Sequence, residues 1–288
     1  MLAGRTQLMS LNEPKEIGTQ GIQAVGRAIR VLEILALSER GMTLSDIARS
    51  LEVNKQIASR LLQTLDELGY TYKYPLSDRF TLSYRLANLG HRKLVQEEVL
   101  DQARTVLLEL AEASGELARL AIVENGRLMW VMAETGKKWM LHINPNYSPA
   151  INFQTTASGK AWLATKPTEA INEILDLAPT TRRTDFTIMN RDNFHDELDV
   201  VRKRGWALSW QESEIGIGAV AAAIMTRGVN GRTCCVGTIS LSAPSNRLSY
   251  SALQEWGPTV SNACLRLGRS WPQQTDTPSL KRAVNSPP

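Results

Sequence analysis

Hydrophobic side chains recur with helical spacing through the first third of the chain. Residues 22–37 place apolar side chains at a period near 3.6, which predicts a helix there. Thr43, followed by Asp46, forms a capping box at the start of a second helix, and Asn54 can cap a third. Gly69 ends that third helix. The second and third helices are therefore joined by a tight turn.

The spacing changes after the third helix. Residues 70–74 alternate tyrosine with polar side chains, residues 75–78 supply a turn, and residues 79–82 resume the alternation. This pattern predicts a hairpin. Three helices followed by a hairpin are typical of a winged helix-turn-helix, which we place at residues 21–83.

The remainder of the chain contains segments with helical spacing and segments with the alternation of strands. Residues 84–113 are helical in pattern and are predicted to form a connector helix. Strands are expected at residues 117–123, 128–133, 140–143, 217–226 and 233–242, the last two flanking an Asn230-Gly231 turn. Helices are expected at residues 157–164, 168–177, 192–204 and 249–268. This order predicts an α+β domain with an antiparallel sheet over residues 114–270. Residues 1–20 and 271–288 are polar or rich in proline, and are predicted to be a disordered leader and tail.

Charge is distributed unevenly along the 288 residues. The first 93 residues carry 13 Lys and Arg against 9 Asp and Glu, so they hold the whole net charge of +4. Three cysteines cannot form an even disulfide framework, which indicates a reducing compartment. The chain shows no signal-peptide pattern and no apolar run long enough for a membrane span. We therefore expect a soluble cytoplasmic protein without a membrane partner.

The predicted third helix has one hydrogen-bonding, basic face opposite its leucines. A basic region that also carries a helix-turn-helix favours double-stranded DNA as the partner, because Gln and Arg side chains can read base edges in the major groove. The candidate DNA-binding residues are Lys55, Gln56, Ile57, Ser59, Arg60 and Gln63 on the helix, with Lys73 and Arg79 in the wing as phosphate contacts. One small domain makes few phosphate contacts, so a homodimer on a palindromic operator is expected, with the connector helix as the dimerisation element.

Beyond these patterns, the chain resembles the isocitrate-lyase-regulator (IclR) family of bacterial transcription factors over roughly residues 22–268. The matching segments are residues 27–35, 43–48, 59–70, 156–164 and 204–207, then Glu212, Gly216 and residues 236–244. The resemblance implies a winged helix-turn-helix joined to a GAF-like effector domain, acting as homodimers or homotetramers on promoters. It also implies effector contacts at Ala157, Ser158, Ser209, Ile217, Ala219, Ser240 and Ser242.

The sequence departs from the family pattern in both domains. The recognition helix of the family often begins Pro-Lys-Ser-Thr, where residues 54–57 here read Asn-Lys-Gln-Ile. Some members carry cysteine at the position of Ala219, and proline is usual at the position of Ala223. Neither the operator sequence nor the effector can therefore be copied from the family.

The side chains themselves suggest an acidic effector. Ser240 and Ser242 lie two apart on a strand, so both hydroxyls face one side, either into a cavity or into solvent from an edge strand. The helix that begins at Ala157 offers backbone N–H groups to an anion. A small organic acid, aromatic acids included, is the predicted ligand. Four tryptophans either wall the pocket or belong to the core: Trp130, Trp139, Trp206 and Trp210.

Two other functions are weighed against regulation. An enzyme with an appended winged helix could use the carboxylates of Glu212 and Glu214, although a structural role for them is favoured. A module that uses its winged helix to bind protein is the other alternative. Histidines occur in unrelated segments, so no metal site is predicted. No cofactor and no catalytic residue is predicted either.

Overall fold

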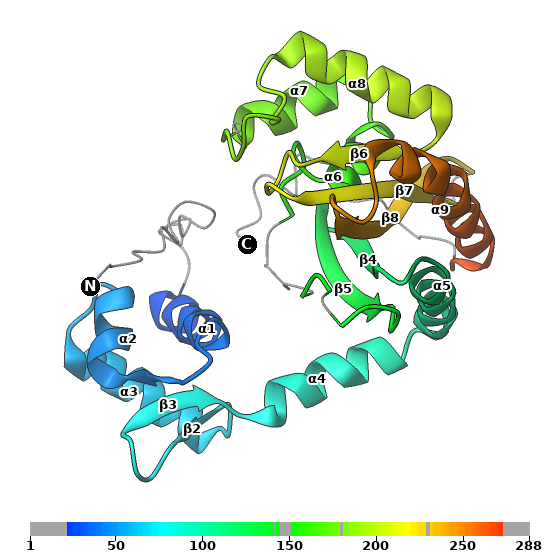
Figure 1. Cartoon of the computed structure of the whole chain (residues 1–288). Helices are drawn as coiled ribbons and strands as arrows, with labels where there is room; N and C mark the ends of the chain where they lie inside the picture. The colour runs from blue at the N-terminus through cyan, green and yellow to red at the C-terminus, as the bar shows by residue number, and fades with distance from the viewer. Residues whose placement is uncertain (1–21, 141, 145–150, 179–180, 229–230, 273–288) are drawn as a thin grey trace. The chain divides into compact units, whose positions relative to one another are not determined.

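A computed structural model describes residues 22–140, 142–144, 151–178, 181–228 and 231–272. The chain divides into two compact units between Glu97 and Glu98. Each unit is described by itself below, with its elements labelled as in Figure 1.

The N-terminal unit is a winged helix-turn-helix. Its elements are α1 (Gln23–Ala36), β1 (Met42–Thr43), α2 (Leu44–Ser50), α3 (Lys55–Glu67), β2 (Thr71–Lys73), β3 (Arg79–Leu82) and α4 (Tyr84–Val95). The three strands form an antiparallel sheet in the order β1-β3-β2. The predicted hairpin therefore gains a third strand, β1, whose two residues are too few to show an alternating pattern.

Apolar stripes on three helices form the core of this unit. Val31, Leu35, Ile47, Leu62 and Leu65 are buried together, at the helical spacing that predicted them. Both predicted caps are present: Thr43 accepts a hydrogen bond from the Asp46 amide, and Asn54 accepts one from the Ile57 amide.

The C-terminal unit is a five-stranded antiparallel sheet between two layers of helices (Figure 1). Its elements are α5 (Glu98–Ser114), β4 (Leu117–Glu124), β5 (Arg127–Thr135), α6 (Ala157–Leu163), α7 (Thr168–Leu177), α8 (Arg191–Arg204), β6 (Ala207–Trp210), β7 (Ile217–Arg227), β8 (Thr233–Pro244) and α9 (Tyr250–Ser270). The strand order is β5-β4-β8-β7-β6, which makes β8 the central strand. Helices α5 and α9 pack on one face, while α6 packs on the other and is itself contacted by α8. The predicted α+β class is confirmed.

Four details differ from the sequence prediction. The predicted connector helix is two helices, α4 and α5, and residues 96–97 between them contain no Gly or Pro to mark the interruption. Residues 140, 142 and 143, predicted as strand, are not strand, and residue 141 lies outside the described residues. Strand β6 was not predicted, because its four residues are too short for a periodic pattern. Trp271, placed in the predicted tail, is buried, and its carbonyl accepts a hydrogen bond from Thr226.

Several predictions fall on residues outside the described ranges. These are the leader (residues 1–20), the tail beyond residue 272 and Asn230 of the predicted turn. Gly231 of that turn is described and has a φ of +74°, a conformation that glycine adopts without strain.

Candidate functional sites

Helix α3 presents the predicted polar face to solvent. Ala58, Leu62 and Leu65 point into the core, so the opposite side of the helix is exposed. Of the six predicted residues on α3, Ile57 is half-buried and the others are exposed: Lys55, Gln56, Ser59, Arg60 and Gln63. Gln63 also donates a hydrogen bond to Glu67 over 3.0 Å, one turn further on. The helix thus offers a continuous hydrogen-bonding surface with the dimensions that a major groove admits.

The two predicted wing residues have different surroundings. Lys73 is exposed and forms an ion pair with Asp78 over 2.6 Å. Arg79 is half-buried and donates to the Gly41 carbonyl over 2.8 Å. Gly41 has a φ of +68°, and a Cβ there would lie 2.7 Å from the Phe80 carbonyl oxygen. Arg79 therefore holds a tight turn in place, a role that the sequence did not indicate.

In the C-terminal unit, the sheet face beneath α6 is built mainly from small side chains. Residues directly opposite one another on antiparallel strands point to the same face. Cross-strand pairing sets out three successive rows on this face. They are Leu117–Ser242–Ala219–Ser209, Arg119–Ser240–Ala221–Ala207 and Ala121–Thr238–Ala223. We call these eleven residues the sheet floor.

The seven residues implied by the family resemblance converge on this face. Ser209, Ala219, Ser240 and Ser242 belong to the sheet floor, and Ile217 lies on the same side of β7 by alternation. Ala157 and Ser158 form the first turn of α6. Just before this helix, the Thr155 carbonyl accepts a hydrogen bond from the Ser209 hydroxyl of β6 over 2.6 Å.

The alternative in which Ser240 and Ser242 face solvent from an edge strand is wrong. Strand β8 is central, and the two residues are 2% and 1% exposed. The Ser242 hydroxyl accepts a hydrogen bond from Arg119. Within the described part of the chain, the buried hydroxyls of Ser158, Thr238 and Ser240 have no hydrogen-bond partner. Buried polar groups are nearly always paired, so three unpartnered hydroxyls close together are unusual.

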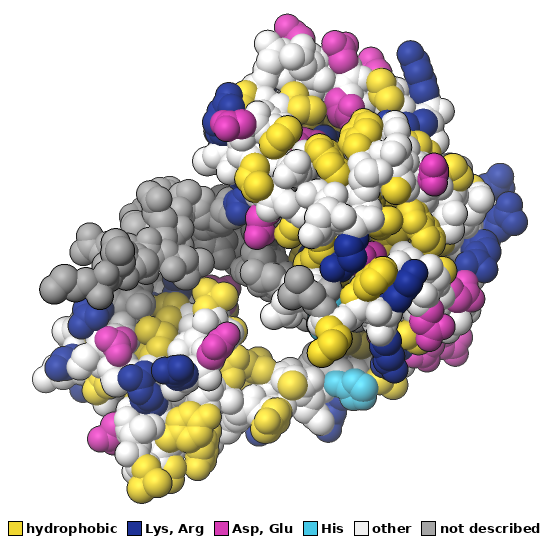
Figure 2. All heavy atoms as spheres, in the orientation of Figure 1, with side chains coloured by type: hydrophobic (Ala, Val, Ile, Leu, Met, Phe, Trp, Pro, Cys, Tyr) yellow, Lys and Arg dark blue, Asp and Glu magenta, His cyan; other side chains and the backbone are white. Residues whose placement is uncertain are grey.

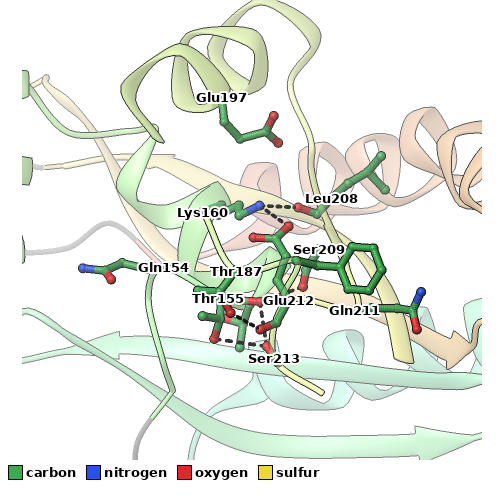
Figure 3. A network of polar contacts seen from close by, with 12 residues as sticks. Gln154, Thr155, Lys160, Thr187, Glu197, Leu208, Ser209, Gln211, Glu212 and Ser213 are labelled. Carbon is green, nitrogen blue, oxygen red and sulfur yellow. Dashed lines mark hydrogen bonds and ion pairs between the residues drawn. The ribbon is translucent and has the colours of Figure 1, made fainter. Parts of the chain in front are cut away.

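A buried ion pair joins α6 to β6 and to the segment that follows it (Figure 3). The Lys160 ammonium lies 2.5 Å from a Glu212 carboxylate oxygen and also donates to the Leu208 carbonyl over 3.1 Å. The side chains of Lys160 and Glu212 are 1% and 8% exposed. Burial raises the pKa of Glu212 above its usual value, and the charge of Lys160 opposes part of that shift. This pair fixes α6 to the segment that leads into β7, which is the structural role favoured for Glu212.

Only one of the four candidate tryptophans lies beside the sheet floor. Trp130 pairs across β4–β5 with Ala121 and stacks on the Arg119 guanidinium at 4.1 Å. Trp206 packs against Gly257 of α9, Trp210 against Tyr250, and Trp139 is 41% exposed. Arg119 was missed from the sequence, because the face to which it points depends on pairing with β8, more than a hundred residues away.

A separate cavity of about 290 Å³ lies near α7 and the start of α8. Its lining comprises Gln154, Leu175, Asp176, Ile188, Met189, Asn190, Arg191 and Phe194. None of the seven implied effector residues lines it, so it is distinct from the sheet floor.

Neither a metal site nor a membrane-spanning helix is found among the residues that the structure describes. These residues contain no cluster of three or more His, Cys, Asp and Glu side chains placed to hold a metal ion. They also contain no helix with the length and apolar character needed to cross a bilayer.

Comparisons with known proteins cover both units. Residues 91–269 match the family described as bacterial transcriptional regulator IclR C-terminal, and residues 24–75 match the IclR helix-turn-helix domain. A glycerol operon regulatory protein of Streptomyces griseus is 32% identical over 80% of this chain and 87% of its own length.

Solved structures share the fold at lower identity. An IclR transcriptional regulator from Alicyclobacillus acidocaldarius is 22% identical, with a TM-score of 0.74 over 86% of this chain and 98% of its own. An IclR homologue from Microbacterium hydrocarbonoxydans, solved in complex with 4-hydroxybenzoate, is 18% identical, with a TM-score of 0.67 over 86% of this chain and 99% of its own.

Proposed function

Because this chain belongs to the IclR family of bacterial transcriptional regulators, we propose that a small organic acid controls its binding to operator DNA. The acid would bind between the sheet floor and α6, and the DNA would be read by α3. The family assignment decides against the enzyme that the sequence left as an alternative.

One observation carries the effector site. Serine and threonine hydroxyls lie buried on the central strand without a hydrogen-bond partner among the described residues, amid a floor of alanines. Small side chains leave space, and hydroxyls recognise the oxygens of a carboxylate or hydroxyl group. A homologue of the same fold was solved with an aromatic hydroxy acid, which supports acids as the first ligands to test.

The DNA-reading residues remain a proposal at the level of single side chains. Lys55, Gln56, Ile57, Ser59, Arg60 and Gln63 are assigned to the major groove, and Lys73 to a phosphate. Arg79 stays a weaker candidate, since the Gly41 carbonyl already binds its guanidinium.

We also propose a homodimer, or a tetramer built from dimers, on a palindromic operator. Along α4, Tyr84, Leu89 and Val95 are 92%, 45% and 62% exposed, and hydrophobic side chains are visible on the surface of this helix (Figure 2). Exposed apolar side chains suit a helix that packs against a second copy. A cytoplasmic location remains a prediction from the sequence.

The test uses the purified full-length protein and the DNA upstream of its own gene. Gel shifts would be run with benzoate, 4-hydroxybenzoate, propionate and lactate, and calorimetry would measure the affinity of each acid. We expect at least one acid to bind and to change operator affinity. Binding without any change in operator affinity would contradict effector control, and failure of the protein to bind this DNA specifically would contradict the choice of operator.

A further inference from the structure

The cavity near α7 and the start of α8 has an unsatisfied hydrogen-bond acceptor in its wall. Gln154 lines this cavity, and the residue is only 6% exposed. Its Nε2 donates to the Ala178 carbonyl over 3.3 Å, which sets the orientation of the amide, because a flipped amide would bring two oxygens together. The buried Oε1 is left without a hydrogen-bond partner among the described residues. An acceptor in this state favours a ligand that brings a donor into the cavity.

The local fold holds Gln154 at this wall. The Asn152 side chain accepts hydrogen bonds from the backbone amides of Gln154 and Thr155, each over 3.0 Å. The segment then continues into α6, and the Gln154 side chain points away from the network around Lys160 and Glu212 (Figure 3). Gln154 therefore serves a different place from the residues of the sheet floor.

The rest of the lining indicates the chemical class of the ligand. Leu175 and Phe194 belong to the core of this unit and Ile188 packs against it, so the cavity has apolar walls. The charged residues of the lining are Asp176 and Arg191, whose exposed side chains pair over 2.7 Å. One cation and one anion that pair with each other offer no counter-charge to an ionised ligand. An uncharged ligand is therefore favoured, since burying an unpaired charge is costly.

The volume of the cavity suits a small molecule. At about 290 Å³, it has roughly twice the volume of an apolar protein cavity that takes up benzene, about 150 Å³. Small-molecule sites combine apolar walls with a few polar groups that fix the orientation of the ligand. A single ring or a short aliphatic chain that carries one hydroxyl matches both the volume and the lining.

We propose that this cavity is a second small-molecule site, which takes an uncharged alcohol or phenol. The hydroxyl of the ligand donates to Gln154 Oε1, and its apolar body packs against Leu175, Ile188 and Phe194. The site goes beyond the proposed function, because it is separate from the sheet floor and from the organic acid proposed there.

The experiment measures the binding of phenol and toluene to the full-length protein by ligand-observed NMR titration. The two molecules have nearly the same shape, but only phenol carries a hydrogen-bond donor. The wild type should bind phenol about 2- to 10-fold more tightly, which corresponds to the net contribution of one hydrogen bond. Gln154→Met removes the acceptor at similar size, so the preference for phenol should disappear. Gln254→Met, which changes an exposed glutamine on α9, is the matched control and should keep the preference.

Met189→Trp tests the location without changing Gln154. Met189 lines the cavity and is 42% exposed, so a larger indole can occupy the cavity without displacing the core. Phenol and toluene should both bind at least about tenfold more weakly to this variant, while the acids named above should bind as they do to the wild type.

Each result bears on a separate part of the proposal. A preference for phenol that persists in Gln154→Met would overturn the role of Gln154, and unchanged phenol affinity in Met189→Trp would overturn the site. The second variant decides alone if Gln154→Met does not fold. Loss of acid binding in Met189→Trp would place the acid in this cavity and contradict an uncharged ligand. If phenol does not bind the wild type at millimolar concentration, this proposal fails, while control of DNA binding by an acid is unaffected.

Discussion

The functional surfaces proposed for the two units of this protein are built in opposite ways. In the N-terminal unit most of that surface is the exposed side of one helix, α3, whose residues lie within a short stretch of chain. In the C-terminal unit it is the buried face of a sheet, to which β4, β6, β7 and β8 contribute residues from widely separated segments. A surface of the first kind can be altered at little cost in stability. A surface of the second kind is also part of the core.

The distribution of aromatic residues lets the two units be followed separately. All seven tryptophans lie between Trp130 and Trp271, in the C-terminal unit. Intrinsic tryptophan fluorescence therefore reports the unfolding of that unit, while gel shifts report the surface of the other.

The largest effect is expected from the buried ion pair. Lys160→Met leaves the Glu212 carboxylate buried without its cation and should cost about 3–5 kcal/mol in the free energy of unfolding. Urea unfolding followed by tryptophan fluorescence would measure it, with the exposed Lys203→Met as the control. In the double variant Lys160→Met/Glu212→Leu no charge remains buried, so much of the loss should be recovered. A double variant no more stable than the single one would contradict this account of the pair.

The same pair predicts a pH dependence. The folded state raises the pKa of Glu212, so the unfolded chain releases that proton first as the pH increases. The stability contributed by Glu212 is thus fully present below its ordinary pKa and is lost as the pH rises through the raised value. Relative to Glu212→Gln, the wild type should lose stability across this range, and Lys160→Met should lose more. Parallel stability curves for the wild type and Glu212→Gln would contradict the raised pKa.

The second effect is expected at the proposed DNA-reading surface alone. Arg60→Ala should weaken operator binding by about 1–3 kcal/mol, without changing the unfolding curve of the C-terminal unit. Gel shifts over a range of salt concentrations would measure both the affinity and its salt slope. Arg269→Ala, which removes an exposed arginine from α9, should change neither. Unaltered DNA affinity in Arg60→Ala would mean that α3 does not read the operator.

The surface on α3 could be predicted from the sequence, whereas the sheet floor could be predicted only in part. The caps at Thr43 and Asn54 and the buried stripe of α3 are local, so the face of α3 could be predicted without coordinates. The place of Arg119 beside Ser240 could not be predicted, because the neighbours of a charged residue within an apolar strand depend on how the sheet is paired. The family resemblance implied Ser240 and Ser242, but nothing in the sequence indicated that Arg119 lies opposite Ser240.

Two glycines offer a third and smaller test. A Cβ on Gly159 in α6 would lie 2.4 Å from the Phe153 carbonyl oxygen, whereas one on Gly90 in α4 would meet nothing within 4 Å. Gly159→Ala should therefore destabilise the C-terminal unit by about 1–3 kcal/mol through overpacking. Gly90→Ala should stabilise its helix by about 0.5–1 kcal/mol, because alanine loses less backbone entropy. Thermal unfolding followed by tryptophan fluorescence and by circular dichroism would separate the two, and a loss of stability in Gly90→Ala would show that α4 is packed more closely than its exposure indicates.

The smallest effect concerns the wing, where Lys73 pairs with a carboxylate and is also proposed to bind a DNA phosphate. Lys73 pairs with Asp78, so a phosphate and this carboxylate compete for the same ammonium. Lys73→Ala should lower the salt slope of operator binding by about one unit per half-site and weaken all DNA sequences alike. Asp78→Asn should instead strengthen binding, since it releases Lys73 from the ion pair. Asp78 has a φ of +49°, which asparagine tolerates as well as aspartate, so the backbone is not strained by this change. Gel shifts on operator and unrelated DNA would measure both variants. Equal slopes in the wild type, Lys73→Ala and Asp78→Asn would mean that the wing does not contact phosphate and that the DNA-binding surface is confined to α3.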